Sequence, residues 1–425
     1  MNSSNQIQSI INDLSRQESG KMVAVLTKIF GTDHIEMAED VVQDAFVKAL
    51  EYWRKQGVPD YPKAWLYRTA KNRAIDIIRK NKHDNIIDFS DPKKQLLTSN
   101  YTLQTTMDSF WEDKHIKDDF LGMMYACCHP DISPENQITF ILKILCGFST
   151  KEIARSFITT EDTISKRLYR TKEYFRKHKI HPKIPSADKI SNRTETVLGA
   201  IYLLFNEGYS ATHSNQLIRK DLIQQAMILC KSLLSSEQTR LPSVYALMSL
   251  MCFQAARVDS RLTQEGELIL LPKQDRTIWN KILIKSGEKY LNEGAFGKSL
   301  STYHLEAAIA YHHCTAKSYK NTDWTAILKY YDMLLNIKND PIVFLNRCLV
   351  ILELKGPKAA LKLIKSVPLD KILEKYYLYY AALGEIYQRL GYNTKAVSNY
   401  EKAVQLTYSK QEIQFLKSKI ASVLN

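Results

Sequence analysis

The chain has 425 residues, which is too many for one small hydrophobic core and enough for two or three domains. Its formal net charge of +14 at pH 7 suits a polyanionic partner. The seven cysteines are odd in number and scattered along the chain, which indicates reduced thiols in the core of a cytoplasmic protein rather than a disulfide framework. We find neither a basic, apolar leader nor a long apolar stretch, so we expect no signal peptide and no membrane span.

Periodicity predicts an all-α fold. Glycine (14) and proline (12) are scarce, and apolar residues recur at spacings of three and four along most of the chain. The exception is a short segment at Glu265–Leu271, where we expect a turn of extended chain.

The first basic segment runs from Lys63 to Lys82, with seven basic residues and one acid. Pro62 can occupy the first turn of a helix that we expect to end near Asn81. On a helical wheel, one face combines cations with an amide, whereas Leu66, Ala70 and Ile77 form the opposite, packing face. The cationic face holds Arg68, Lys71, Asn72, Ile75, Arg79 and Lys82. Such a face can bind phosphates and read a base, and Trp65 and Tyr67 are available for stacking on an unpaired base. The alternative is a solvated charged face with Trp65 in the core.

An acidic connector follows. Residues from Asp84 to Glu135 include ten acids against four lysines, and 88–106 is rich in Asp, Ser, Thr and Asn. We expect the repulsion between these charges to keep the linker extended.

A helix-turn-helix is predicted over residues 149–178. Ser149 and Glu152 fit a capping box that opens one helix, and Thr159 with Asp162 resembles a second. A small core can be closed by Ile153, Phe157, Ile164 and Leu168. Ala154 is small where the two helices approach each other. The side chains that project from the front of the second helix are Thr163, Lys166, Arg167 and Arg170, where a recognition helix meets the major groove. Other helical hairpins share this pattern, so the motif alone is only moderately specific.

Together these segments resemble the extracytoplasmic-function group of sigma-70-type sigma factors. The resemblance rests on AEDVVQDAFVKALEYW (Ala38–Trp53), PKAWLYRTAKNRAIDIIRK (Pro62–Lys80) and Ser133–Lys177, in the family's order. Further segments, including IYLLFNEGYSA (Ile201–Ala211) and GELILLPKQDRTIW (Gly266–Trp279), resemble a subgroup with a long tetratricopeptide-like extension. The offsets of Tyr380, Leu383, Gly384, Tyr387, Ala396, Tyr400 and Ala403 independently fit one such repeat, and Gly356 with Gly391 suggests a degenerate upstream copy.

The resemblance implies four segments: sigma-70 region 2 (5–83), an acidic linker (84–114), a region 4 helix-turn-helix (115–180) and a helical, tetratricopeptide-like regulatory domain (192–425). It implies core RNA polymerase and promoter DNA as partners. Because the C-terminal array is over half of the chain, we expect it to regulate the sigma activity by binding a regulatory protein or by docking on the sigma domains. Contacts with the polymerase clamp would come from Asp40, Gln43, Asp44 and Phe46. Contacts with the −10 element would come from Trp65, Arg68, Lys71, Asn72, Arg73, Arg79 and Lys80, and contacts with the −35 element from Thr163, Lys166, Arg167 and Arg170.

No sequence pattern indicates catalysis, so we expect no enzyme, no cofactor and no metal. Cys127, Cys128 and His129 are adjacent, as are His312, His313 and Cys314, which is poor spacing for one metal ion. Two other functions remain open: a regulator that binds DNA alone and senses a ligand through the repeats, and an interaction scaffold with an inert N-terminal part. Neither accounts for the segment 38–80.

Overall fold

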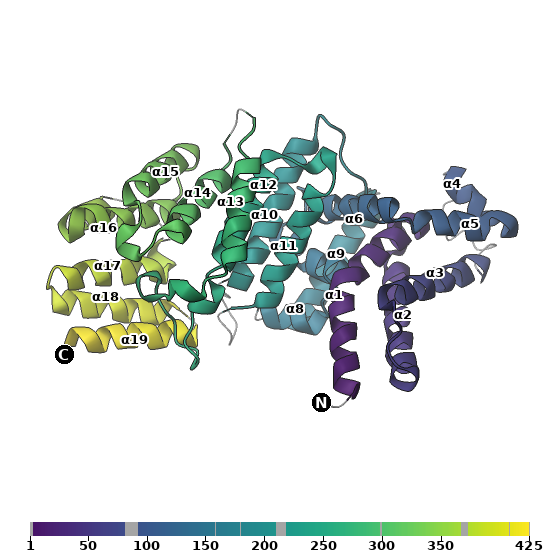
Figure 1. Cartoon of the computed structure of the whole chain (residues 1–425), viewed down its shortest axis with the longest axis horizontal. Coiled ribbons are helices and arrows are strands. Elements are labelled where there is room, and N and C mark those ends of the chain that lie inside the picture. The colour runs from purple at the N-terminus through teal and green to yellow at the C-terminus, as the bar shows by residue number, and fades with distance from the viewer. Residues whose placement is uncertain are drawn as a thin grey trace. The chain divides into compact units, whose positions relative to one another are not determined.

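The computed structural model describes residues 3–80, 92–157, 159–178, 180–209, 218–297, 300–366, 373–407 and 409–424. The fold is all-α, as predicted, and these residues contain no strand (Figure 1). Near the segment expected to be extended, a single antiparallel bridge pairs Leu262 with Leu268. Across the described ranges, no helix combines the length and the apolar character that crossing a bilayer requires.

The chain divides into two compact units, residues 1–204 with 235–239, and residues 205–234 with 240–425. The helices of the first unit are α1 (Ser3–Phe30), η1 (Thr32–His34), α2 (Ile35–Gln56), α3 (Pro62–Lys80), α4 (Pro92–Gln95), η2 (Leu96–Thr98), α5 (Asn100–Phe110), α6 (Asp113–Cys127), α7 (Pro134–Phe140), the π-helical turn η3 (Ile141–Leu145), α8 (Thr150–Ser156), α9 (Glu161–His178), the first part of α10 (Ile190–Tyr209) and η4 (Glu237–Thr239).

The N-terminal part of the first unit is built on α1 and α2, which pack side by side, with α3 against α2. Trp53 of α2 is fully buried, and α3 contributes Leu66 and Ala70 to the core, as the helical wheel predicts. The wheel is wrong for two residues. Ile75, assigned to the cationic face, is buried, whereas Ile77, assigned to the packing face, is only half-buried. The buried stripe therefore follows Leu66, Ala70, Ala74 and Ile78, because α3 meets its neighbours on a line rotated from the predicted one.

The acidic connector is not an extended chain where it is described. Its residues form α4, η2, α5 and the start of α6, and α5 packs against α3. Leu97, Leu103, Met107 and Phe110 are buried, so apolar burial outweighs the charge repulsion on which the prediction rested. Asp84 and Asp88 lie outside the described residues.

The start of α10 belongs with the first unit rather than with the C-terminal array. The Arg193 guanidinium donates to the Tyr125 carbonyl at 2.6 Å, and the hydroxyls of Tyr125 and Thr194 are 2.6 Å apart. Thr194, Val197, Leu198 and Ile201 line up on the buried face of α10. The tertiary boundary therefore falls inside a helix that the sequence assigned wholly to the array.

The second unit contains α11 (Lys220–Leu234), α12 (Pro242–Ala255), η5 (Val258–Ser260), η6 (Leu271–Lys273), η7 (Arg276–Ile278), α13 (Lys281–Glu293), α14 (Thr302–Thr315), η8 (Tyr319–Asn321), α15 (Trp324–Ile337), α16 (Pro341–Lys365), η9 (Leu373–Lys375), α17 (Tyr377–Arg389), α18 (Asn393–Leu406) and α19 (Lys410–Leu424). Its centre is α12, which is buried on nearly every side by α11, α13 and α14. The Arg276 guanidinium donates to the carbonyls of His313 and Ala316, so it caps the C-terminus of α14.

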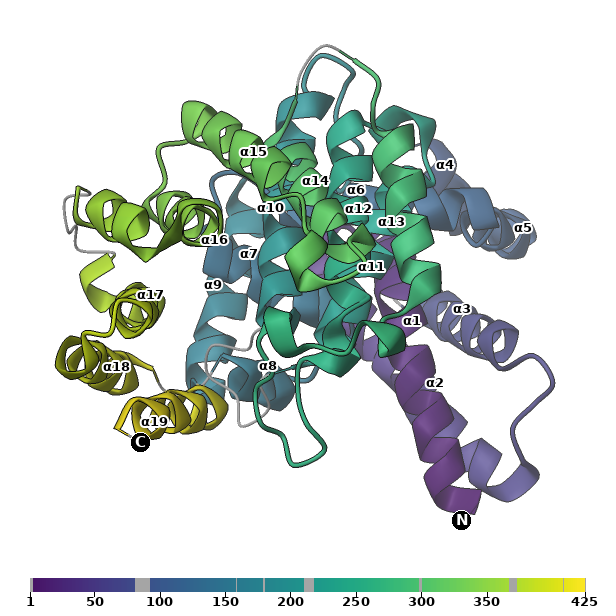
Figure 2. The same cartoon turned by 60° about the vertical axis from the view of Figure 1, so that its left-hand side comes forward.

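Helical hairpins form the end of the chain, where α17, α18 and α19 lie in successive layers (Figures 1 and 2). Gly384 permits the close approach of α17 and α18, because a Cβ there would lie 2.6 Å from the Tyr400 ring. Gly391 turns the chain between these helices at φ 77°, and Gly356 has φ 79° at a kink within α16. The two glycines thus share a positive φ, and the upstream copy of the hairpin stays a prediction.

Candidate nucleic-acid interface

The outer face of α2 carries most of the residues expected to contact polymerase. Asp40, Gln43 and Asp44 are exposed and Phe46 is half-buried, whereas Val41 and the alanines of the same helix are buried. Asp44 already has a partner within the chain, since its Oδ2 lies 3.3 Å from the Arg73 Nε. Arg73, which we assigned to DNA phosphates, therefore lies beside the expected polymerase surface.

The outer face of α3 presents Arg68, Asn72, Arg79 and Lys80 to solvent. Within the described residues, no carboxylate is within ion-pair distance of Arg68 or Arg79. Lys71 differs, because it pairs with Asp108 of α5. Of the seven expected −10 residues, four are thus open on α3, while Lys71 and Arg73 pair with acids of neighbouring helices and Trp65 is half-buried.

Trp65 lies at the start of α3 within an aromatic cluster. Its ring stacks on Tyr52, with centroids 5.7 Å apart and planes 24° apart, and it meets Trp53 edge-on. Tyr52 is 52% exposed and Trp65 half-buried, so one edge of this stack faces solvent. The cluster fixes the Trp65 ring at the N-terminal end of α3.

A buried carboxylate beneath α3 escaped the sequence reasoning. Glu18 of α1 is 6% exposed and accepts a hydrogen bond from the Tyr67 hydroxyl at 2.6 Å. Lys21 and Lys63 lie 3.0 and 3.6 Å from the same carboxylate. Burial, followed by the charge of Glu18, raises the pKa of Tyr67 far above its usual range. Tyr67 thus anchors α3 to α1, and the polar sequence around Glu18 gave no signal that this acid would be buried.

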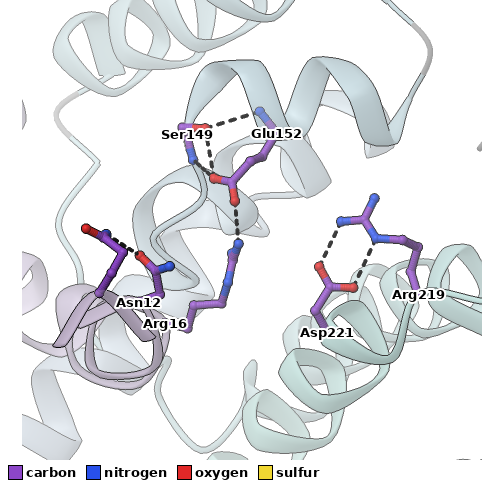
Figure 3. A network of polar contacts seen from close by, with 7 residues as sticks. Asn12, Arg16, Ser149, Glu152, Arg219 and Asp221 are labelled. Carbon is purple, nitrogen blue, oxygen red and sulfur yellow. Dashed lines mark hydrogen bonds and ion pairs between the residues drawn. The ribbon is translucent and has the colours of Figure 1, made fainter. Parts of the chain in front are cut away.

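The predicted helix-turn-helix geometry corresponds to α8 and α9, which pack together. The Ser149–Glu152 capping box forms, with the Glu152 carboxylate accepting from the Ser149 amide at 2.8 Å (Figure 3). The second cap is displaced by one residue, because Thr160 rather than Thr159 accepts from the Thr163 amide. The core residues Ile153, Ala154, Ile164 and Leu168 are buried, as predicted, and Phe157 is half-buried.

The front of α9 holds the four residues expected to face the −35 element. Lys166 and Arg170 are exposed, whereas Thr163 and Arg167 are half-buried. Lys166 pairs with Asp162 at 2.7 Å, but both side chains are more than 60% exposed, so this pair is weak and can exchange for a phosphate. The Thr163 hydroxyl lies 2.9 Å from that of Thr160 and helps to close the helix cap.

Comparisons with known proteins agree with this geometry at the N-terminus. Residues 14–83 match the family model of sigma-70 region 2. Residues 14–83 are therefore similar to a sigma-70 region 2 domain, and we refer to them as region 2. This domain contains α2 and α3, and it supports assignment to the sigma-70 factors, with RNA polymerase and promoter DNA as partners in transcription initiation.

The remaining comparisons extend along the chain without adding a function. Residues 193–295 match a family of unknown function (DUF6596). An uncharacterized protein of Rhizobium meliloti (strain 1021) is 28% identical over 387 residues, which cover 91% of this chain and 90% of that protein. No solved structure matches the chain.

Region 2 makes direct ionic contact with α9. Glu39 of α2 is buried, and its carboxylate lies 2.8 Å from Lys172 of α9. Glu36 contacts the same lysine at 3.3 Å and Arg176 at 3.7 Å. Burial alone would lower the pKa of Lys172, but the carboxylates of Glu39 and Glu36 outweigh burial and raise it. The basic residues of α9 therefore have two separate roles, since Lys172 holds region 2 while Lys166 and Arg170 face solvent.

A second contact joins α1 to the start of α8 (Figure 3). Arg16 donates to the Glu152 carboxylate at 2.6 Å, and its guanidinium lies 3.6 Å from the centroid of the Phe148 ring. Gly20 packs directly on the backbone, because a Cβ there would lie 2.2 Å from the Leu145 carbonyl oxygen. Burial raises the pKa of Glu152, yet the hydrogen bonds from Ser149 and the charge of Arg16 bring it below its ordinary value.

The expected polymerase surface borders this contact. A cavity of about 190 Å³ lies between α1, α2 and the segment after η3. Gln43 and Phe46 line one side of it, and Gly147 and Phe148 line the other. Two of the four expected polymerase residues thus lie next to α8, while Asp40 and Asp44 face away from this cavity.

The cysteine and histidine clusters have ordinary structural surroundings. Cys127 and Cys128 are buried, and burial raises the pKa of the Cys128 thiol to about 12. Burial lowers the pKa of His313 to about 3. Over the described part of the chain, no three His, Cys, Asp or Glu residues group as metal ligands do.

Proposed function

We propose that this protein is an RNA polymerase sigma factor of the extracytoplasmic-function type, in which a tetratricopeptide-like C-terminal domain regulates promoter use. The observation that carries the proposal is the open face of α3. Arg68, Asn72 and Arg79 project to solvent from one helix, within the residues that match sigma-70 region 2. Arginines for phosphates, an amide for a base edge and a nearby aromatic stack are the groups that reading an opened strand requires.

In this proposal the residues act by binding and positioning. The exposed acids Asp40 and Asp44 on α2 would meet a basic polymerase surface, and Arg68 and Arg79 would hold phosphates next to Trp65 and Asn72. Lys166, Arg167 and Arg170 of α9 would enter the major groove at the −35 element. Bond formation belongs to the polymerase, so the protein supplies location and strand separation.

The contact between region 2 and α9 has a mechanical consequence for this function. The −10 and −35 elements are about 25 base pairs apart, which is roughly 85 Å of duplex at about 3.4 Å per base pair. In the structure, α3 packs on α2, and α2 pairs with α9 through Glu39 and Lys172. With helices about 10 Å thick, the two DNA-binding helices are on the order of 20 Å apart. We infer that these ion pairs open when the protein assembles with polymerase on a promoter.

Regulation through the C-terminal domain is supported by the size and character of the second unit. It holds a cavity of about 410 Å³, lined by α11, α12 and α13, with Met227, Met248 and Leu283 among the lining residues. This volume lies in the range of small-ligand sites, although stacked hairpins equally suit a bound helix or peptide of a regulatory protein.

Transcription with purified core polymerase tests the proposal. We expect the full-length protein to direct initiation from defined promoters, and start-site mapping after overexpression to give one shared promoter motif. Arg68→Ala combined with Arg79→Ala should abolish initiation while holoenzyme still assembles. A protein that binds specific DNA tightly without core polymerase, and directs no initiation with it, would be a conventional regulator.

A further inference from the structure

Positive charge is concentrated in the second unit. Residues 205–234 and 240–425 carry 29 Lys and Arg against 18 Asp and Glu, whereas the remainder of the chain carries 30 against 27. The surplus is strongest near the C-terminus, where residues 355–419 carry twelve basic residues against five acids. Eleven of those twelve are lysines. A large surplus of positive charge therefore lies in the part of the molecule farthest in sequence from the expected promoter-reading helices.

These charges are arranged in register on the α17–α18 hairpin. The Lys395 ammonium lies 5.8 Å from the centroid of the Tyr387 ring, and the Lys402 ammonium lies 5.4 Å from that of Tyr380. The two lysines are seven residues apart on α18, as the two tyrosines are on α17, so they mark two rungs of an antiparallel ladder. Such cation–π contacts hold the lysines over the tyrosine rings without neutralising their charge.

The ladder extends at its Tyr387 end onto α16 and to an exposed ring. Lys365 of α16 lies 5.9 Å from the centroid of Tyr387, and Lys395 lies 5.5 Å from that of Tyr392. Tyr392 is 53% exposed. We call the set Lys365, Tyr380, Tyr387, Tyr392, Lys395 and Lys402 the lysine–tyrosine face. Lys358 and Lys362 are exposed on α16 at the spacing that places them on the same side as Lys365.

Carboxylates do not neutralise this face. Throughout the described residues, none of its three lysines has an ion-pair partner. The nearby acids are already engaged or few: Glu385 pairs with Arg389 and Lys419, and Glu353 pairs with Arg389. Glu374 contributes a negative charge close to Tyr380, and Glu401 is exposed beside Lys402. The Tyr387–Tyr392 end is accordingly the more cationic of the two ends.

The residue types favour a nucleic acid over a protein as the partner. Protein interfaces are depleted in lysine and enriched in arginine, whereas this face has lysines only. Sequence-independent binding to phosphates needs positive charges that displace counterions, which these lysines supply. Exposed aromatic rings next to such charges provide stacking platforms for unpaired bases.

We propose that the lysine–tyrosine face is a second nucleic-acid-binding surface, which holds the phosphodiester backbone without sequence preference. Duplex DNA next to a promoter and single-stranded RNA or DNA share this backbone. The three lysines contact phosphates, and Tyr392 stacks on a base only when the bound strand is unpaired. The surface acts independently of α3 and α9, so it does not depend on the sigma-factor proposal.

The test measures binding of the full-length protein to labelled random-sequence nucleic acid by fluorescence anisotropy, across roughly 50 to 200 mM salt. The triple variant Lys365→Gln, Lys395→Gln and Lys402→Gln is compared with the wild type. The matched control is Lys281→Gln, Lys285→Gln and Lys289→Gln, which removes the same charge from three exposed lysines of α13. Thermal unfolding followed by circular dichroism confirms that both variants are folded.

We expect the face variant to reduce the slope of log affinity against log salt by about 2 to 3, at roughly 0.9 per lost phosphate contact, and to weaken binding at least about tenfold. The α13 control should leave the slope unchanged. Tyr392→Ala should weaken binding to single strands by about fivefold or more and leave duplex binding intact. Tyr392→Ala without effect on either probe would overturn the stacking role of Tyr392.

Two results would overturn the proposal. Equal losses in the face variant and the α13 control would mean that net charge alone attracts nucleic acid. Binding of polyglutamate that depends on the three lysines, with unchanged affinity for nucleic acid, would instead identify an acidic protein as the partner.

Discussion

The helices α3 and α9 are both strongly basic, yet the structure uses their charges differently. On α3 the cations divide between an open face with Arg68 and Arg79 and two residues, Lys71 and Arg73, that pair with acids of neighbouring helices. On α9 the division is along the helix, because Lys166 and Arg170 face solvent while Lys172, further on, holds the buried Glu39. A count of basic residues therefore overstates the surface available to DNA on both helices, and only the partner of each cation separates a binding residue from a structural one.

The largest expected effect comes from reversing the structural charge of α9. Lys172→Glu would leave the buried Glu39 next to a like charge, and breaking a buried pair costs about 3–5 kcal/mol. We expect α2 to separate from the α8–α9 hairpin, which energy transfer between dyes at the exposed positions 48 and 151 would report. Lys166→Glu, on the exposed side of the same helix, is the control and should change the transfer little. Equal responses from both variants would show that Lys172 does not hold the two regions together.

The next largest effects are expected from substitutions of the proposed DNA-reading residues of α9 and α3. Arg167→Ala should reduce discrimination at the −35 element by about 1–3 kcal/mol if its contact with a guanine is bidentate. Band shifts with intact and scrambled −35 duplexes in the presence of core polymerase measure this difference. A loss that is the same for both duplexes would identify Arg167 as a phosphate contact.

Asn72→Ala is the counterpart on α3. It should impair strand opening at −10 and leave duplex binding at −35 intact, because Asn72 is exposed on the face expected to meet the opened strand. Permanganate reactivity of unpaired thymines measures opening. Normal opening in the Asn72→Ala variant would mean that the amide does not read a base.

A smaller effect is expected at the polymerase-facing side of region 2. Asp44→Arg places a positive charge against a basic clamp and beside Arg73, and it should weaken holoenzyme formation several-fold. Glu51→Arg makes the same change at another exposed position of α2 and serves as the control. Pull-down titrations with core polymerase distinguish the two, and identical affinities would move the polymerase surface away from Asp44.

The smallest effect concerns the cap of α8 and depends on pH. The pKa of Glu152 in the folded protein lies below its ordinary value of 4.5, so the ionised carboxylate stabilises the fold above that pH. This contribution should disappear as the pH falls below about 4.5 and through the lowered pKa. At neutral pH, Glu152→Gln keeps an oxygen for the cap but loses the charge that pairs with Arg16, so it should cost about 1 kcal/mol or less, measured by urea unfolding. A difference between wild type and variant that stays constant down to pH 3 would contradict this account.

Several parts of the fold could be predicted from local patterns. The capping box of Ser149 and Glu152 and the glycine turn at Gly391 depend on residues close in sequence, so the sequence alone can predict them. The all-α class likewise follows from apolar spacing. The wheel of α3 was wrong at Ile75, because the direction in which a helix packs depends on neighbours that the helix itself does not specify. The helical connector was missed because α5 gains its stability by packing on α3.

The sequence by itself determined the helices, their caps and the identity of the cationic segments, because these follow from residues within a few positions of one another. The tertiary structure decided which cations remain available. Lys71, Arg73 and Lys172 each meet a carboxylate between 29 and 133 residues away in sequence. The energy of an ion pair falls as the distance between its two charges grows. These charges come close to each other only once the helices have packed.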